Sequence, residues 1–297
     1  CSDDGDGEEI DEELEKIEFE PQSNSYIMQP NSRIAIPVTH GFAAWEYFKS
    51  MGQEPTADEI LSGKVLNLAD VNNLEGKLSA KIIWQEDQDN SAEPNVVSKA
   101  FIYNPEGLKH ISEAKLIVET NEALGNALVA VHIGATGTDK DPVLWKWHIW
   151  VPDGIPAEVP SEGKWIFMDR YLGAVDNKPI DLDLSKPRTR NAHGLYYQWG
   201  RPTPIKKYGD VERTTVVSES EGYNMALALQ SSKFIIRGGL DYNQAADWYS
   251  RGDGMKWMSR WGSISTKSTI KLPKTLLDPY PAGWRVPDWI KENYSSS

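Results

Sequence analysis

One twelve-residue run, at residues 142–153, most constrains the fold of this 297-residue chain. It reads PVLWKWHIWVPD, and strand alternation places Trp145 and Trp147 on one face and Trp150 on the other. A strand with bulky apolar side chains on both faces must be covered by a layer on each side. We therefore predict a buried strand that closes a first domain and packs near a second.

Residues 21–153 have a β texture. Short segments rich in Ile, Val, Tyr and Trp, such as NVVSKAFIYN and NALVAVHIG, are separated by Asn, Gly, Pro and Asp. This pattern predicts an antiparallel β-sandwich over residues 21–153. The exception is Phe42–Met51, for which we predict one or two helical turns between strands. Residues 154–163, GIPAEVPSEG, have the composition of a linker.

Residues 164–297 differ in character. Three runs, WIFMDRYLG, GLYYQWGR and KFIIRGG, predict strands, and long polar segments separate them. Glu221–Leu229 predicts a helix, and Pro287–Asn293 predicts another because proline suits the first turn of a helix. We therefore predict an α+β second domain over residues 164–297, with long loops of the kind that usually carry binding sites.

The acidic charge of the chain is concentrated at its start. Residues 1–20 hold eleven acidic residues and one lysine, a net charge of −10, so the formal charge of −13 leaves −3 for the remaining 277 residues. The body lacks the basic surface that nucleic-acid binding requires, so no nucleic-acid partner is predicted. We predict that residues 1–20 form a solvated tether, because like charges oppose a helix there.

The chain contains one cysteine, at position 1. A cysteine there resembles the mature start of a bacterial lipoprotein, whose thiol carries the lipid, and the run SDDGDGEE resembles the surface-export signal of Bacteroidetes lipoproteins. The resemblance implies lipid attachment at Cys1 after removal of a signal peptide. Two or more acyl chains anchor a protein stably. We therefore expect a cell-surface lipoprotein of the outer membrane.

Three motifs, WIFMDRYLGA, GLYYQWGR and DPYPAGWRVP, occur in this order in the second half. Together they resemble the Fibrobacter succinogenes major paralogous domain family. The upstream segments GNALVAVHIG and VLWKWHIWVPD resemble the region that precedes this domain in cell-surface and fimbria-associated lipoproteins. The likeness covers about residues 120–290. It implies a C-type-lectin-like α+β domain with long loops and no established catalytic activity.

The chain departs from the family pattern at two places. Family members usually have a cysteine where Tyr280 stands, so the corresponding disulfide is ruled out. The family domain often continues well beyond the WRVP motif, whereas this chain ends ten residues after Pro287. A truncated domain, with a lectin-like binding surface also missing, is therefore one expectation.

The signature residues of these motifs are Asp169, Arg170, Trp284 and Arg285. The structural interpretation, which we favour, places Trp284 in the core and pairs Arg285 with a buried carboxylate, for which Asp169 is the natural candidate. The alternative is direct contact of Trp284 and Arg285 with a ligand.

Two further aromatic groups are candidates for ligand contact. Tyr197, Trp199 and Arg201 share one face of a predicted strand and could stack on a sugar ring or a peptide side chain. A buried core strand is the alternative for this group, and we favour it. A second group lies in a loop-like segment with two glycines, where it either contacts a ligand or folds back into the core: Trp248, Trp257 and Trp261.

The sequence is poor in catalytic motifs. Its five histidines have no metal-ligand spacing such as HExxH, and neither a GxSxG motif nor a P-loop is present. No cofactor or metal is predicted. Our first hypothesis is therefore a surface lipoprotein that binds an extracellular glycan or protein without catalysis. The alternatives are a fimbrial or other surface-assembly subunit that exchanges strands, and an accessory polysaccharide-degrading enzyme.

Overall fold

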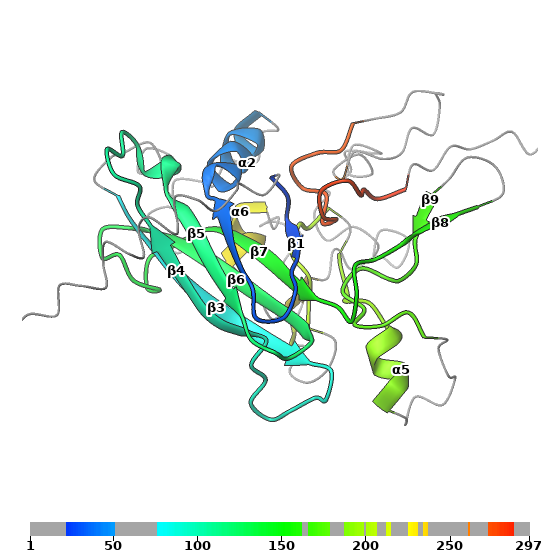
Figure 1. The fold of residues 1–297 in the computed structure, drawn as a ribbon. Coiled ribbons are helices and arrows are strands. Elements are labelled where there is room, and N and C mark those ends of the chain that lie inside the picture. The colour runs from blue at the N-terminus through cyan, green and yellow to red at the C-terminus, as the bar shows by residue number, and fades with distance from the viewer. Residues whose placement is uncertain are drawn as a thin grey trace, which may run out of the picture.

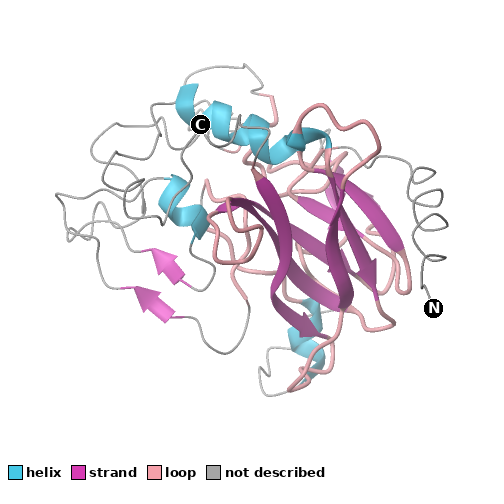
Figure 2. Cartoon of the chain, turned by 90° about the vertical axis from the view of Figure 1, so that its left-hand side faces the viewer, coloured by secondary structure: helices cyan, strands magenta, loops and turns pink. Residues whose placement is uncertain are grey.

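The computed structural model of the chain describes residues 22–50, 76–161, 166–178, 187–198, 200–206, 212–214, 225–230, 234–236, 261 and 273–287. In these ranges the protein is mainly β, as predicted, and its long strands lie together in one part of the molecule (Figures 1 and 2). The larger sheet has the order β1 (Ser25–Ile27), β7 (Val143–Val151), β6 (Gly125–Gly134) and β3 (Lys77–Asp87). The second sheet has the order β2 (Arg33–Pro37), β5 (Lys115–Thr120) and β4 (Val97–Tyr103).

Strand β7 lies inside the larger sheet, and all nine of its residues are buried. It pairs antiparallel with β6, where Trp147 faces Val129, and with β1 on the other side. The prediction of a strand covered on both faces is confirmed. The antiparallel prediction is wrong at β1, which runs parallel to β7. Mixed sheets with one strand of opposite sense at the edge are common, and the residue pattern of a three-residue strand carries no signal for its direction.

Both sheets contribute to one hydrophobic cluster. Ile36 and Val118 enter it from the second sheet, and Val129 and Trp147 enter it from the larger one. The cluster continues into the second half of the chain, where it includes Leu229, Trp261, Leu277 and Val286 among its buried members. The predicted domain boundary at residues 154–163 stays a prediction, but the described residues on its two sides share this core.

Helix α2 (Thr39–Ser50) confirms the prediction of helical turns near Phe42. Trp45 is fully buried, and its Nε1 donates a hydrogen bond of 2.7 Å to the carbonyl oxygen of Leu144 in β7. Gly41 allows the helix to approach β7 closely, because a Cβ at this position would lie 2.9 Å from Cβ of Trp145. The helix therefore forms part of the layer that covers β7.

The second half contains shorter elements. Strands β8 (Glu158–Pro160) and β9 (Ile166–Met168) form an antiparallel two-stranded ribbon, so the segment predicted as a linker contains a strand. The GLYYQWGR run does not form the predicted strand in its described part, because Tyr196 makes only an isolated bridge with Ile205.

The remaining elements are η1 (Ile111–Glu113), α5 (Pro187–Ala192), β10 (Glu212–Thr214), α6 (Met225–Gln230) and β11 (Phe234–Ile236). Strand β11 confirms the KFIIRGG prediction, and α6 overlaps the predicted helix and ends one residue beyond it. The helix predicted at 287–293 falls almost wholly outside the described residues.

Candidate binding site

The DPYPAGWRVP motif forms a loop around two charged residues. Asp278 is fully buried, and its carboxylate accepts backbone hydrogen bonds from Tyr280 (2.8 Å) and Val286 (2.9 Å). Lys274 Nζ donates to the carbonyl oxygens of Tyr280, Pro281 and Trp284 at 2.7, 2.9 and 2.7 Å. Because burial disfavours charge, the pKa of Asp278 is raised and that of Lys274 is lowered. These bonds hold both ends of the loop.

The loop is also bound by a segment about 250 positions earlier in the chain, Ser23–Ser25. Ser23 Oγ and Ser25 Oγ donate to the carbonyl oxygens of Tyr280 (2.8 Å) and Pro279 (2.6 Å). Asn24 Nδ2 donates to the carbonyl oxygens of Leu276 (2.7 Å) and Asp278 (2.8 Å). We call this set of bonds the N-terminal clasp. It joins the beginning of the described chain to its last described range.

The clasp is anchored in the core through Asn24. The Oδ1 of Asn24 accepts hydrogen bonds from Trp145 Nε1 and His40 Nε2, both at 2.9 Å. Burial lowers the pKa of His40 to about 4, so the ring is neutral at pH 7. Because Asn24 Oδ1 can only accept, the proton of the neutral ring lies on Nε2. Asn24 therefore connects α2, β7 and the motif loop with both ends of its amide.

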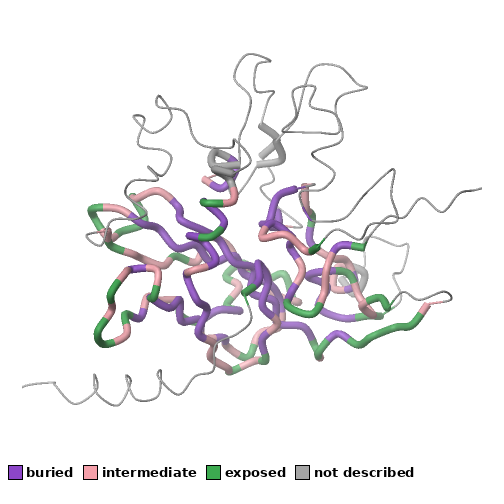
Figure 3. Tube along the Cα trace, turned by 90° about the horizontal axis from the view of Figure 1, so that it is seen from above, coloured by how far each residue is buried: buried purple, intermediate pink, exposed green. Residues whose placement is uncertain are grey.

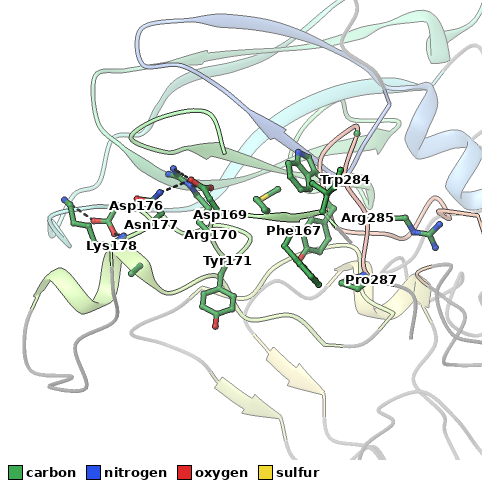
Figure 4. A pocket seen from close by; sticks show the side chains of 15 residues that line it. Phe167, Asp169, Arg170, Tyr171, Asp176, Asn177, Lys178, Trp284, Arg285 and Pro287 are labelled. Atoms are coloured by element: carbon green, nitrogen blue, oxygen red, sulfur yellow. Dashed lines mark hydrogen bonds and ion pairs between the residues drawn. The ribbon is translucent and has the colours of Figure 1, made fainter. Parts of the chain in front are cut away.

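A cavity of about 660 Å³ lies between this loop and the WIFMDRYLGA motif. Its wall includes four aromatic side chains: Phe167, which is 44% exposed, Tyr171, which is 64% exposed, and the half-buried Tyr280 and Trp284. Figure 4 shows Phe167 close to Trp284 and Tyr171 projecting away from the ribbon. The structural prediction that Trp284 fills the core is wrong, because the side chain belongs to the cavity wall. Exposed aromatic faces of this kind can stack on a ligand.

An ion-pair cluster lies beside the aromatic wall. Arg170 donates to Asp169 Oδ1 (2.9 Å) and Asp153 Oδ1 (2.6 Å), and only 5% of its side chain is exposed. The hydrogen bond from Arg170 is the main cause of the lowered pKa of Asp169. The predicted pairing of Arg285 with Asp169 is wrong: Arg285 Nε bonds the carbonyl oxygen of Val286, and the side chain points away from Asp169 (Figure 4). The partner of Asp169 is its neighbour Arg170.

A second cavity, of about 360 Å³, brings all three motifs together. It shares Tyr171 and Tyr280 with the first cavity, and Tyr196, Tyr197 and Trp261 also line it. The three motifs, which are separated in the sequence, therefore lie next to one another in the folded protein.

The other predicted ligand-binding residues lie at different depths. Arg201 is buried and donates to Gln198 Oε1 at 2.8 Å, and Trp261 Nε1 donates to the carbonyl oxygen of Arg201 at 3.3 Å. Tyr197 packs against the core, and its hydroxyl lies 3.4 Å from His148 Nδ1. Arg201 and Trp261 thus belong to the protein interior, and their role in binding stays a prediction. The remaining predicted residues lie outside the described ranges: Cys1, Trp199, Trp248 and Trp257.

Sequence reasoning missed Phe167 and Tyr171 as candidates for ligand contact. Both stand in the WIFMDRYLGA motif, and a strand pattern alone does not reveal that both faces of Ile166–Met168 are accessible. The available signal was Gly173, two residues after Tyr171, because glycine favours turns; the structure has a turn at Leu172–Gly173, where Gly173 has a φ of +84°.

Within the described ranges, none of the helices has the length and apolar character that a membrane crossing requires. No group of three or more His, Cys, Asp or Glu side chains in the same ranges is placed to hold a metal ion. Comparison with protein-family models, curated proteins and solved structures gave no match. The resemblance to the major paralogous domain family therefore stays a prediction.

Proposed function

We propose that this protein is a surface-anchored lipoprotein that binds an extracellular glycan or protein without catalysis. The observation that carries the proposal is the cavity of about 660 Å³ between two of the sequence motifs. Its exposed aromatic residues, Phe167 and Tyr171, offer apolar faces to a ligand, and the partly buried pair Asp169–Arg170 lies beside them. A preformed cavity that combines aromatic and polar side chains is a typical binding site.

We propose a fold of two parts, a β-sandwich at residues 21–153 and a second domain at residues 164–297. Two sheets that share one core support a β-sandwich at residues 21–153, although β1 is parallel to its neighbour. Short strands and long connections support a C-type-lectin-like second domain. The lipid would be attached at Cys1, and the acidic residues 1–20 would act as the tether to the outer membrane.

The carboxylates of the cavity support binding over catalysis. A general acid for glycoside hydrolysis needs a raised pKa, and the pKa of Asp169 is lowered by its bond from Arg170. The other carboxylate of the wall, Asp176, accepts a bond from the backbone N–H of Lys178 and lies 3.5 Å from its ammonium group. The lowered pKa of Asp169 thus speaks against a general-acid role for this residue, and Asp176 already has hydrogen-bond and ion-pair partners.

The binding proposal is tested with soluble Cys1→Ser protein on a glycan array and on immobilised extracellular proteins. We expect Tyr171→Ala and Phe167→Ala to weaken binding by at least about tenfold, because aromatic anchors carry much of the energy of an interface. Tyr196→Ala is the matched control, since Tyr196 is also exposed (55%) but does not line the first cavity. Unchanged binding by both variants would place the site elsewhere.

Absence of any ligand in both screens would contradict the binding proposal. Ladders of increasing size at increasing protein concentration would then support the surface-assembly subunit. The anchoring proposal has its own test: protein expressed with a lipoprotein signal peptide should partition into detergent and be cut by protease added to intact cells. Protection from that protease would contradict surface exposure.

A further inference from the structure

Among the described residues, strand β9 has one hydrogen-bonding edge to which no other strand pairs. The bond from the backbone N–H of Asp169 to the carbonyl oxygen of Ala157 (2.9 Å) sets the alternation of the ribbon. Ile166 and Met168 are therefore in non-hydrogen-bonded positions, and their N–H and C=O groups point away from β8. No described residue pairs with these groups. A further strand can therefore pair with this edge, where Ile166 and Met168 together offer two N–H donors and two C=O acceptors.

The opposite edge of the ribbon is blocked. The outward-facing residues of β8 are Glu158 and Pro160. Proline has no N–H, and a charged side chain discourages strand addition, so β8 carries two of the devices that protect natural sheet edges. Strand β9, with the sequence IFM, carries neither.

Both faces of the ribbon expose apolar side chains. Val159 (46% exposed) and Phe167 (44%) form a cross-strand pair on one face, and Ile166 (56%) lies on the other. The ribbon lies apart from the main sheets, at the right of Figures 1 and 3, where the trace is largely exposed. A two-stranded ribbon is marginally stable in water, and a third strand with apolar cover stabilises it.

The first cavity adjoins β9 and forms a groove beside it. All three residues of β9 line it, together with Trp284 and Pro287 of the motif loop. Its described charged lining residues are three cations, Arg170, Lys178 and Arg285, and two carboxylates, Asp169 and Asp176. The groove therefore complements a neutral or weakly acidic segment better than a basic one.

We propose that β9 binds an extended peptide segment of a protein ligand as a third strand of the ribbon. The segment alternates apolar and polar residues, is neutral or weakly acidic, and places apolar side chains against Phe167 and Trp284. This inference rests on the proposed binding function and names its ligand class. A peptide matches the outward backbone groups of Ile166 and Met168 because its own donors and acceptors repeat every two residues. A glycan has no such repeat.

The first experiment measures binding of soluble Cys1→Ser protein to an array of synthetic nonapeptides. Peptides that alternate an apolar with a polar residue are compared with block-ordered peptides of identical composition, and each set is made with one added Glu or one added Lys. We expect the alternating Glu-containing peptides to bind best. Equal binding of alternating and block-ordered peptides would overturn the proposal.

The second experiment removes a single outward N–H. Met168→Pro deletes the outward N–H of Met168 in β9. Glu158 is paired with Met168 across the ribbon, and Glu158→Pro deletes its outward N–H on the blocked edge of β8. We expect Met168→Pro to weaken binding of the best peptide by roughly fivefold to tenfold, the effect of one backbone hydrogen bond. Glu158→Pro should bind as well as the parent protein. Equal binding by all three proteins would overturn the proposal.

A third measurement needs no protein variant and so stays informative if Met168→Pro does not fold. N-methylation of the best peptide, one position at a time, should weaken binding at every second residue. A loss that does not alternate would overturn strand addition. Binding to glycans but to no peptide would overturn this inference and leave the proposed function standing, whereas binding to neither would overturn both.

Discussion

At the scale of single residues, Arg170 has the role that sequence reasoning assigned to Arg285. Its guanidinium contacts two carboxylates, Asp169 and Asp153, and the carbonyl oxygen of Val175. Proximity explains the outcome: Asp169 and Arg170 are neighbours in the chain, so little loop entropy opposes their pairing. The pairing of Arg285 with Asp169 would have required the motif loop to turn its side chain in the opposite direction (Figure 4).

We predict that Arg170→Ala lowers the free energy of unfolding by about 2–3 kcal/mol. Removing the guanidinium leaves Asp169 without its main counter-ion, and the penalty stays below that of a fully buried pair because Asp153 is partly exposed. Arg285→Ala should have a smaller effect, because it leaves the Asp169 pair intact and Arg285 is half-buried, whereas only 5% of the Arg170 side chain is exposed. Urea denaturation of the three proteins checks the order, and equal destabilisation by the two variants would contradict it.

At the scale of elements, α2 and the motif loop are coupled to β7 through buried polar groups. His40 in α2 donates to Asn24, and no described residue is within hydrogen-bonding distance of its Nδ1. A second proton on the ring would therefore be buried without a partner. This arrangement makes the packing of α2 dependent on a neutral histidine.

We predict a loss of stability in mild acid that depends on His40. Its pKa is about 4 in the folded protein and about 6.5 in the unfolded chain, so the unfolded state binds the proton first as the pH falls. The free energy of unfolding should decrease by up to about 1.4 kcal/mol per pH unit between pH 6.5 and pH 4, about 3 kcal/mol in total.

The measurement is urea denaturation at several pH values in this window, for the parent protein and for His40→Gln, whose amide can still donate to Asn24. Other groups titrate in both proteins, so the difference between the two isolates His40. We expect this difference to change across the window in favour of the variant at low pH. A difference independent of pH would contradict the assignment.

At the scale of the whole molecule, the N-terminal clasp and the shared core unite residues on both sides of the predicted domain boundary. Ser23 and Tyr280 are 257 positions apart and joined directly. Trp145 and Leu277 lie in the same hydrophobic cluster. Two segments that depend on each other in this way cannot lose their packing independently.

We therefore predict that the chain unfolds in one cooperative transition in calorimetry, and that Asn24→Ala lowers its midpoint. The substitution removes two donors from the motif loop and leaves Trp145 Nε1 and His40 Nε2 without their acceptor, at a cost of about 2–4 kcal/mol. Two separate transitions in the parent protein would instead support domains that are independent at residues 154–163.

Much of the first half was predictable because its signals are local. The two-sided apolar pattern of β7 and the helix near Phe42 depend on the spacing of neighbouring side chains, and this spacing can be read directly from the sequence. The candidate site was predictable only in part. The three motifs were identified, but Trp284 was assigned to the core and Phe167 and Tyr171 were passed over, because exposure depends on what packs against a segment and not on its own pattern.

The sequence by itself determined which segments are strands with two buried faces, which carry a helix, and which three motifs mark the second half. Only the tertiary structure decided that β1 is parallel to β7, that Asp169 pairs with Arg170, and that Asp278 is enclosed by Lys274 and the clasp. The physical reason is that periodicity acts over a few residues, whereas burial and hydrogen-bond partners depend on contacts between segments up to 257 positions apart.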